Sequence, residues 1–398
     1  MNTNKFGMFI HWGIYSLGGR HEQEIARFDI PNLEYEKNIT RFNPTSYDPE
    51  SWVLLAKKAG MEYICFTTKH HDGFCMWDTK YTDYNIMNTP YGKDVLLMLS
   101  EACKKHGMKL SLYYSNPDWN HPKGYNPDST HQWKSIDKEH PDTIIYREFI
   151  RNQVRELLTN YGEIYTFFWD IPALIYDPSM NEFVRSLQPG IIINNRGWDD
   201  GDFSTPERNY ATAEGHRFTR MTEACNSVGE QSWGYRSDED FYSIRYLISS
   251  IDHIMAMGGS YLLNVGPTPL GEIAPEYVRH IERIGDWYCR MNGALVAHEE
   301  DTFDYGVENN DCIVTKKDGK SYFHFYDGLI SSAVSMRRFP NLPKSVLLLN
   351  TGEYLKFKIE QMPEWFDMKT GIADTMLHIS GIPTDELVSE AIVIEITW

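Results

Sequence analysis

The first 260 residues alternate between short apolar runs and longer segments with helical periodicity, and this alternation restricts the fold more than any other feature. The run "MEYICFTT" at 61–68 is apolar and rich in β-formers, as a buried strand should be. The preceding segment 49–60, "PESWVLLAKKAG", places Trp52, Leu55, Ala56 and Ala59 on one helical face. The same succession of strand and helix recurs along the chain as far as "SYLLNVGP" at 260–267.

Strands that alternate with helices of this length form a parallel sheet built from right-handed strand–helix–strand units. The strands are apolar until their last residues, which indicates that both faces of the sheet are covered. Six or seven strands within about 290 residues favour a (β/α)8-type barrel in which one element is missing or distorted. An open, doubly wound sheet is the alternative, although no GxGxxG turn supports it.

The sequence changes in character after about residue 300. Long helical segments give way to short alternating runs such as "DCIVTKKDGKSYFHFYD" and "ELVSEAIVIEITW", broken by Gly, Asn and Asp. This pattern predicts antiparallel strands. We therefore expect a (β/α)8-like catalytic barrel over residues 1–300 and a small C-terminal antiparallel β-sandwich over 301–398.

Charge and composition exclude several classes of function. The formal net charge is −18, and no Lys/Arg run interrupts it, so neither nucleic acid nor an anionic membrane is an expected partner. No apolar stretch is long enough to cross a membrane. Six scattered cysteines predict free thiols rather than a disulfide framework. The N-terminus lacks a signal-peptide pattern, which leaves the compartment open between the cytoplasm and export with a leader removed.

Polar side chains follow five consecutive predicted strands. A parallel barrel places its active site at the carboxyl ends of its strands and in the loops that follow them. One polar strand end is expected by chance, whereas five that converge predict a site. The candidates at these strand ends and loops are His11, Trp12, Glu24, His70, His71, Tyr113, Trp169, Asp170 and Arg196.

Asp170 is the sharpest candidate, because it follows the apolar run "TFFW" at the border between core and solvent. It is either a nucleophile or base, or an aspartate that caps the next loop through a backbone N–H. Glu207 and Glu223 follow it in the chain, and two carboxylates from different elements can serve as nucleophile and acid/base in glycoside hydrolysis.

The adjacent histidines in "KHHDGF" could bind a metal, a polar substrate or a structural partner. Neighbouring strand side chains point to opposite faces, so His70 and His71 would not share one ion without a bend. A serine triad would need a nucleophile motif, and no GxSxG is present. Hydrogen bonding to a polar substrate, or structural pairing with Asp72 or a carbonyl, remains, with no metal expected.

Six segments in order resemble the α-L-fucosidases of glycoside hydrolase family 29. They are "FGMFIHWGIYS", "KHHDGFCMWDTKYTDYN", "LYYSNPDW", "FFWD", "SWGY" and "LLNVGP", and the resemblance extends from about residue 5 to 290. It implies a retaining exo-α-L-fucosidase that acts on fucosylated oligosaccharides or glycoconjugates without a cofactor. The oligomeric state, including a homo-oligomer, stays open.

The same resemblance implies roles for individual residues. Asp170 matches the family's nucleophile. Glu207, in "DFSTPERN", is the preferred acid/base, Glu223 the alternative and Glu214 a more distant third. The matching sugar-binding positions are His11, with Trp12 beside it, Glu24, His70, His71, Tyr113, Trp169 and Arg196.

Two departures from the family pattern keep other functions open. Ile171 and Pro172 follow the nucleophile position, where the family usually has a small residue, and no Trp precedes Glu223. One alternative is therefore a related α-glycosidase for a fucose-like sugar such as an α-L-galactoside. The other is a catalytically impaired sugar-binding homologue.

Overall fold

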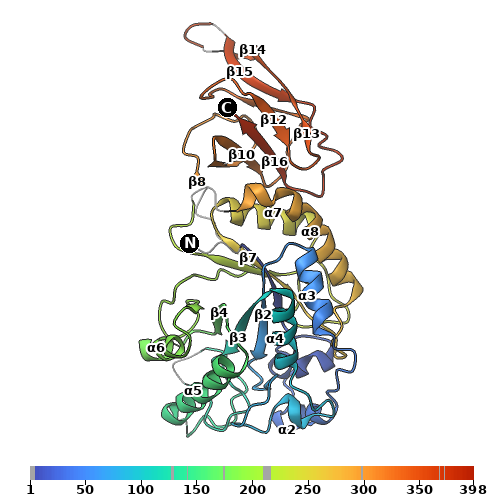
Figure 1. Cartoon of the computed structure of the whole chain (residues 1–398), viewed down its shortest axis with the longest axis vertical. Coiled ribbons are helices and arrows are strands. Elements are labelled where there is room, and N and C mark those ends of the chain that lie inside the picture. Colours follow the sequence, from blue (N-terminus) through green and yellow to red (C-terminus); the bar gives the residue numbers. More distant parts are fainter. Residues whose placement is uncertain are drawn as a thin grey trace.

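The computed structural model describes residues 5–126, 130–140, 142–173, 175–208, 217–296, 299–366, 368–371 and 373–398. Its parallel strands and most of its helices form one half of the molecule, and the C-terminal strands form the other half beyond α7 and α8 (Figure 1). The helices are α1 (Glu24–Arg27), α2 (Asn32–Tyr35), α3 (Pro49–Lys58), α4 (Val95–His106), α5 (Thr143–Asn160), α6 (Pro178–Leu187), α7 (Ile244–Ala256) and α8 (Pro275–Leu295), with short 3-10 turns at Ile14–Gly18, Glu36–Thr40 and Ile86–Asn88.

A curled, seven-stranded parallel sheet forms the centre of the larger half, in the order β5-β4-β3-β2-β1-β7-β6. This arrangement confirms the predicted barrel-type α/β fold. Its strands are β1 (Phe6–Ile10), β2 (Tyr63–Lys69), β3 (Lys109–Ser115), β4 (Thr166–Asp170), β5 (Ile192–Ile193), β6 (Glu223–Ser227) and β7 (Ser260–Val265).

The gap between β5 and β6 is bridged by the irregular segment 203–207 instead of a regular strand. Parallel bridges join Asn194 to Phe203 on one side, and Ser204 to Thr222 and Glu207 to Cys225 on the other. The distorted element that the sequence predicts is therefore this segment, and it carries Glu207 to the edge of the barrel.

Local signals explain where the helices begin and end. The Asp94 carboxylate caps α4 by accepting from the Leu97 N–H, and Gly107 ends the helix with a φ of 64°. Helix α3 begins at Pro49 after the Asp48 cap, within the segment that the periodicity predicts. Each βα unit is thus bounded by its own sequence, which fixes where the strand ends that carry polar residues can lie.

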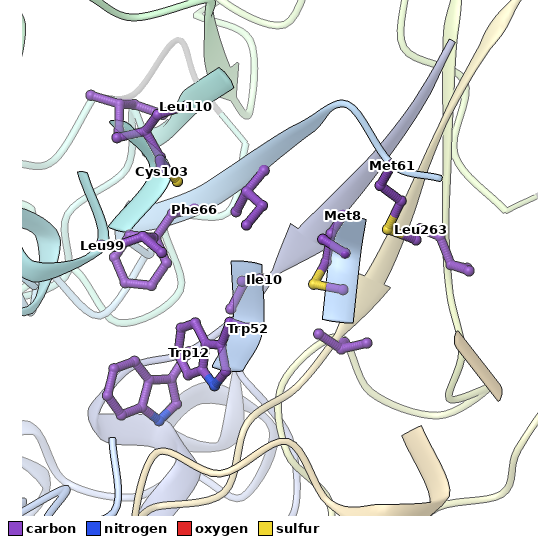
Figure 2. Close-up of a cluster of buried hydrophobic side chains, with 14 of the residues drawn as sticks. Met8, Ile10, Trp12, Trp52, Met61, Phe66, Leu99, Cys103, Leu110 and Leu263 are labelled. Atoms are coloured by element: carbon purple, nitrogen blue, oxygen red, sulfur yellow. The ribbon is translucent and has the colours of Figure 1, made fainter. Parts of the chain in front are cut away.

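Alternate side chains of the strands pack on opposite sides of the barrel wall. Met8, Ile10 and Trp12 of the β1 region point out toward the helices and join a large cluster with Trp52 of α3 (Figure 2). Phe9, from the same strand, belongs to a smaller cluster inside the barrel, together with residues of the other strands. This period of two decides which strand residues can reach the barrel mouth.

The C-terminal half consists of two antiparallel sheets, as the sequence predicts. Their strands are β8 (Glu299–Glu300), β9 (Ile313–Lys317), β10 (Lys320–Phe325), β11 (Ala333–Met336), β12 (Ser345–Leu348), β13 (Glu353–Tyr354), β14 (Lys356–Phe366), β15 (Ala373–Ser380) and β16 (Ile392–Thr397). They enclose a hydrophobic cluster of their own. A domain boundary at residue 300 stays a prediction.

Helix α7 contacts the C-terminal sheets through buried polar groups. Asp252 of α7 and His324 of β10 lie 2.8 Å apart, and both side chains are fully buried. The described helices include none that is long and apolar enough to span a membrane.

Candidate active site

The Asp170 carboxylate lies at the carboxyl end of β4, where three side chains from other elements surround it. The Tyr113 hydroxyl of β3 donates a 2.6 Å hydrogen bond to Oδ2, and His71 Nε2 is 3.8 Å from the same oxygen. Arg196, which follows β5, contacts Oδ1 at 2.7 Å. Burial by itself would raise the pKa of Asp170, but Arg196, His71 and Tyr113 outweigh it and hold the pKa well below its usual range. Asp170 is therefore a buried, fully ionised carboxylate.

Arg196 links the two carboxylates that the sequence singles out. One terminal nitrogen contacts Asp170, and the other donates a 2.9 Å hydrogen bond to Glu207 Oε2. Asp170 is nearly buried, whereas the Glu207 side chain is 36% exposed. The guanidinium thus links a buried and a more exposed carboxylate that line one cavity.

The pocket histidines are held as neutral imidazoles with defined hydrogen-bonding roles. His11 Nδ1 lies 2.7 Å from Asn264 Oδ1, and the Asn264 amide nitrogen donates to Ser227 and to the Trp233 carbonyl. The Asn264 oxygen is therefore the acceptor, His11 Nδ1 carries the proton, and Nε2 keeps its lone pair. Burial lowers the pKa of His11 to about 4, against smaller opposing effects of nearby carboxylates.

His71 follows the same logic. The Ser115 hydroxyl donates to the Pro117 carbonyl, so it accepts from His71 Nδ1 at 2.7 Å. Burial lowers the pKa of His71 to about 4, although the charge of Asp170 opposes this effect. His70 is buried as well, and its Nδ1 has no hydrogen-bond partner in the described part of the chain. The Nε2 atoms of His11 and His71 therefore keep their lone pairs and can accept hydrogen bonds from the hydroxyls of a neutral, polar ligand.

Both His70 and His71 line the cavity, which strict strand alternation would not allow. The pairing of β2 with β3 shifts register between Thr67 and Lys69, and the strand ends at Lys69. Lys69 points away from the cavity and forms a buried ion pair of 2.9 Å with Asp118. The chain therefore bends at the two adjacent histidines, so that both side chains face the same cavity. Among the described residues, however, no group of three His, Cys, Asp or Glu side chains could hold a metal ion.

The structure brings Glu22 into the cavity wall in place of the predicted Glu24. Glu22 Oε2 accepts hydrogen bonds from the Ser232 hydroxyl at 2.8 Å and from the Trp233 N–H at 2.9 Å. Glu24 is buried elsewhere, against Gly18, and pairs with Arg20 at 3.3 Å. The two glutamates stand in "HEQEIAR", where sequence spacing alone does not decide between them.

Trp12 and Trp169 are fully buried outside the cavity. The Trp12 indole N–H donates to the Thr268 carbonyl and that of Trp169 to Asn181, so both rings pack behind the barrel wall. Each lies one residue from a cavity residue and points the opposite way. They support the neighbouring His11 and Asp170 from outside the site.

Glu223 lies at the first residue of β6, at the amino ends of the strands and thus at the opposite end of the barrel from Asp170. Its carboxyl accepts a 2.5 Å hydrogen bond from Tyr63, which is the first residue of β2. Burial raises the pKa of Glu223 to about 7, and the Tyr63 hydrogen bond opposes this effect. The third acid/base candidate, Glu214, lies outside the described residues.

Replacing Glu223 by Gln should stabilise the protein at alkaline pH. The folded pKa of about 7 exceeds the ordinary value of 4.5, so the native carboxyl loses stability as the pH rises through this interval. Each pKa unit corresponds to about 1.4 kcal/mol, which gives a gain near 3 kcal/mol above pH 7. Urea unfolding at pH 4.5 and pH 8 measures this gain. A gain that is equal at both pH values would contradict a neutral buried carboxyl.

The departure from the family pattern after Asp170 places Ile171 in a strained backbone conformation. It adopts a φ of 57°, a left-handed conformation that costs a β-branched residue about 1–3 kcal/mol. The Asn116 side-chain amide donates to its carbonyl at 2.9 Å, which holds this turn. Glycine would take this conformation without strain, whereas Ile171 adds an apolar side chain to the cavity wall.

The cavity measures about 420 Å³, and its lining includes residues that sequence patterns do not single out. Phe9, Phe168 and Trp233 form an apolar side, and the Phe9 and Phe168 rings lie 5.3 Å apart. Trp233 belongs to the segment "SWGY", so the signal for it was present in the motif. His131 and Trp133 line the outer part, and no motif marked them.

Comparison with known proteins places the chain in a family. The alpha-L-fucosidase family model matches residues 1–294. Tissue alpha-L-fucosidase from Bos taurus is 26% identical over 332 residues, covering 73% of this chain and 67% of that protein.

Solved structures extend the likeness to the whole chain. Alpha-L-fucosidase isoenzyme 1 from Paenibacillus thiaminolyticus superposes with a TM-score of 0.83 and 30% identity, over 100% of this chain and 97% of that one. A family 29 alpha-L-fucosidase from Bacteroides thetaiotaomicron, solved as a trapped covalent intermediate with 2-fluoro-fucosyl fluoride, has a TM-score of 0.78 and 25% identity, over 99% and 94% of the two chains. The chain therefore belongs to the alpha-L-fucosidase family and is a glycoside hydrolase.

Proposed function

We propose that the protein is a retaining exo-α-L-fucosidase, with Asp170 as nucleophile and Glu207 as acid/base. The observation that carries this proposal is the ionised Asp170 carboxylate, held by Tyr113 and Arg196 at the base of a cavity that neutral imidazoles also line. The covalent intermediate trapped in the Bacteroides thetaiotaomicron relative supports a two-step mechanism.

In the first step, an Asp170 oxygen attacks the anomeric carbon of the fucosyl unit and the glycosidic C–O bond breaks. Glu207 gives its proton to the leaving oxygen. Tyr113 and Arg196 keep Asp170 ionised and oriented until its charge is lost in the new C–O bond. The product of this step is a β-linked fucosyl-enzyme and a free alcohol.

In the second step, Glu207 takes a proton from water, and the resulting oxygen attacks the anomeric carbon from the side that the leaving group has vacated. Asp170 departs as a carboxylate, so two inversions yield α-L-fucose. The 36% exposure of the Glu207 side chain suits a group that exchanges protons with water in every cycle.

The cavity walls match the chemistry of fucose. His11 and His71 present acceptors to its hydroxyl groups, His70 lines the same wall, and Glu22 adds a carboxylate. Phe9, Phe168 and Trp233 offer an apolar surface for the C5 methyl group. The polar and apolar walls of the cavity therefore complement a neutral sugar that carries one methyl group.

Comparison of two aryl glycosides tests the sugar assignment. We expect kcat/KM for 4-nitrophenyl α-L-fucoside to exceed that for the α-L-galactoside by about 10²-fold, because the galactoside places a hydroxyl against the apolar wall. Initial-rate kinetics on both substrates measure the ratio. A preference for the galactoside would overturn the fucose assignment, and the absence of turnover on any α-glycoside would leave only sugar binding.

A further inference from the structure

A line of aromatic rings leads from the proposed nucleophile to the rim of the cavity. The His71 ring, beside Asp170, lies 5.6 Å from that of His131, which lies 4.6 Å from that of Trp133. His71 is buried, whereas Trp133 is 52% exposed and still lines the cavity. The leaving group of an exo-acting enzyme must extend from the anomeric carbon toward solvent, which is the direction that this line of rings takes.

The segment that carries Trp133 is fixed to the segment around α1. The Lys134 ammonium pairs with Asp29 at 2.6 Å, and the Asn32 side chain donates to the Lys134 carbonyl at 2.8 Å. The Trp119 indole N–H donates to the His131 carbonyl at 2.7 Å. These contacts hold the exposed indole at the rim before any ligand binds, which lowers the ordering cost of binding.

Arg27, the last residue of α1, lines the same cavity and is not used by the proposed chemistry. Its Nε donates a 3.3 Å hydrogen bond to Gln23, and it forms no ion pair in the part of the chain that the structure describes. Burial is the largest cause of the lowered pKa of His131, and the charge of Arg27 adds a smaller lowering effect. The guanidinium therefore faces the outer cavity with donors to spare.

We propose that Trp133 and Arg27 form the leaving-group subsite and that it takes a pyranose attached directly to the fucosyl unit. The apolar face of this second sugar stacks on the indole of Trp133, and Arg27 donates hydrogen bonds to its hydroxyls or ring substituents. The inference rests on the proposed function, because it places the second sugar relative to a fucosyl unit at Asp170. It favours fucosyl disaccharides over fucosides of small alcohols.

The test compares two substrates that differ in the leaving group. α-L-Fucosyl fluoride needs only the fucose pocket, whereas a set of 1→2, 1→3, 1→4 and 1→6 fucosyl disaccharides also needs the subsite. For Trp133→Ala we expect kcat/KM on the best disaccharide to fall about tenfold, with fucosyl fluoride changed less than twofold. For Arg27→Gln, kcat/KM should fall several-fold on the disaccharide alone. Trp133→Phe should retain most of the activity that the alanine variant loses.

Controls separate the subsite from folding and from the proposed function. Tyr354→Ala removes a 73% exposed ring in the C-terminal half and Arg41→Gln an exposed arginine away from the cavity, and neither should change the ratio of the two rates. Equal losses on both substrates, no loss on either, or a native enzyme that cleaves the fluoride but none of the disaccharides would each overturn the subsite. A native enzyme inactive on fucosyl fluoride would instead remove the proposed function on which the inference rests.

Discussion

Replacement of Asp170 by Gly should lower kcat/KM on an aryl α-L-fucoside by about 10⁴-fold or more, because the attacking carboxylate is removed. Azide should restore part of the rate by entering the space left by the side chain. It would attack the anomeric carbon from the face that Asp170 occupies, so the product should be β-L-fucosyl azide. Product analysis by NMR identifies the anomer.

A control must separate the loss of the nucleophile from a disturbance of its neighbours. The carboxylate contacts Tyr113, Arg196 and His71, so its loss could disturb their placement as well as the chemistry. Asp170→Asn keeps the side-chain volume and provides the matched control, with an equally large loss and no rescue by azide. Near-normal turnover in either purified variant would show that Asp170 is not the nucleophile.

Replacement of Glu207 by Ala should lower kcat/KM by about 10²- to 10⁴-fold, and the loss should depend on the leaving group. The rate of the first step should fall least with fucosyl fluoride, because its leaving group needs little protonation. Azide should accelerate turnover here too, but it would now attack the β-linked fucosyl-enzyme and yield α-L-fucosyl azide. Opposite anomers from the two variants would assign the two roles independently.

Glu223→Gln is the matched control for Glu207. Glu223 lies at the amino ends of the strands and bonds to Tyr63, so its replacement should change kcat by less than twofold. A large, azide-rescued loss in Glu223→Gln together with near-normal Glu207→Ala would reverse the acid/base assignment. Loss in both variants without any azide product would indicate that neither carboxylate acts in proton transfer.

The barrel was predictable because its determinants are local and repeated. Each strand is an apolar run and each helix carries its own periodic stripe and end signals, such as Asp94 before α4 and Gly107 after it. The irregular segment 203–207 was predictable only as a defect, since its pairing with β5 and β6 depends on bridges between distant residues.

The cavity was predictable in part. The predicted residues that reach it lie at or just after strand ends and are His11, His70, His71, Tyr113, Asp170 and Arg196. Trp12 and Trp169 stand beside them, and the period of two that sends them outward was readable from the sequence once the strand positions were set.

Other parts of the site depend on how loops fold. Glu22 reaches the cavity through contacts with Ser232 and Trp233, which lie more than 200 residues away in the chain. Trp133 is placed by Lys134, Asp29 and Asn32, and none of these contacts leaves a periodic signal. Loop residues that meet only after the chain has folded are beyond the reach of pattern and spacing.

The most direct test of the central claim is mass spectrometry of the enzyme after incubation with 2-deoxy-2-fluoro-α-L-fucosyl fluoride. The fluorine at C2 slows both steps, and the good leaving group lets the covalent intermediate accumulate. We predict one fluorofucosyl unit per chain, carried after proteolysis by the peptide that contains Asp170 and attached to that carboxylate. Label on any other carboxylate, or time-dependent inactivation without a covalent adduct, would contradict the account.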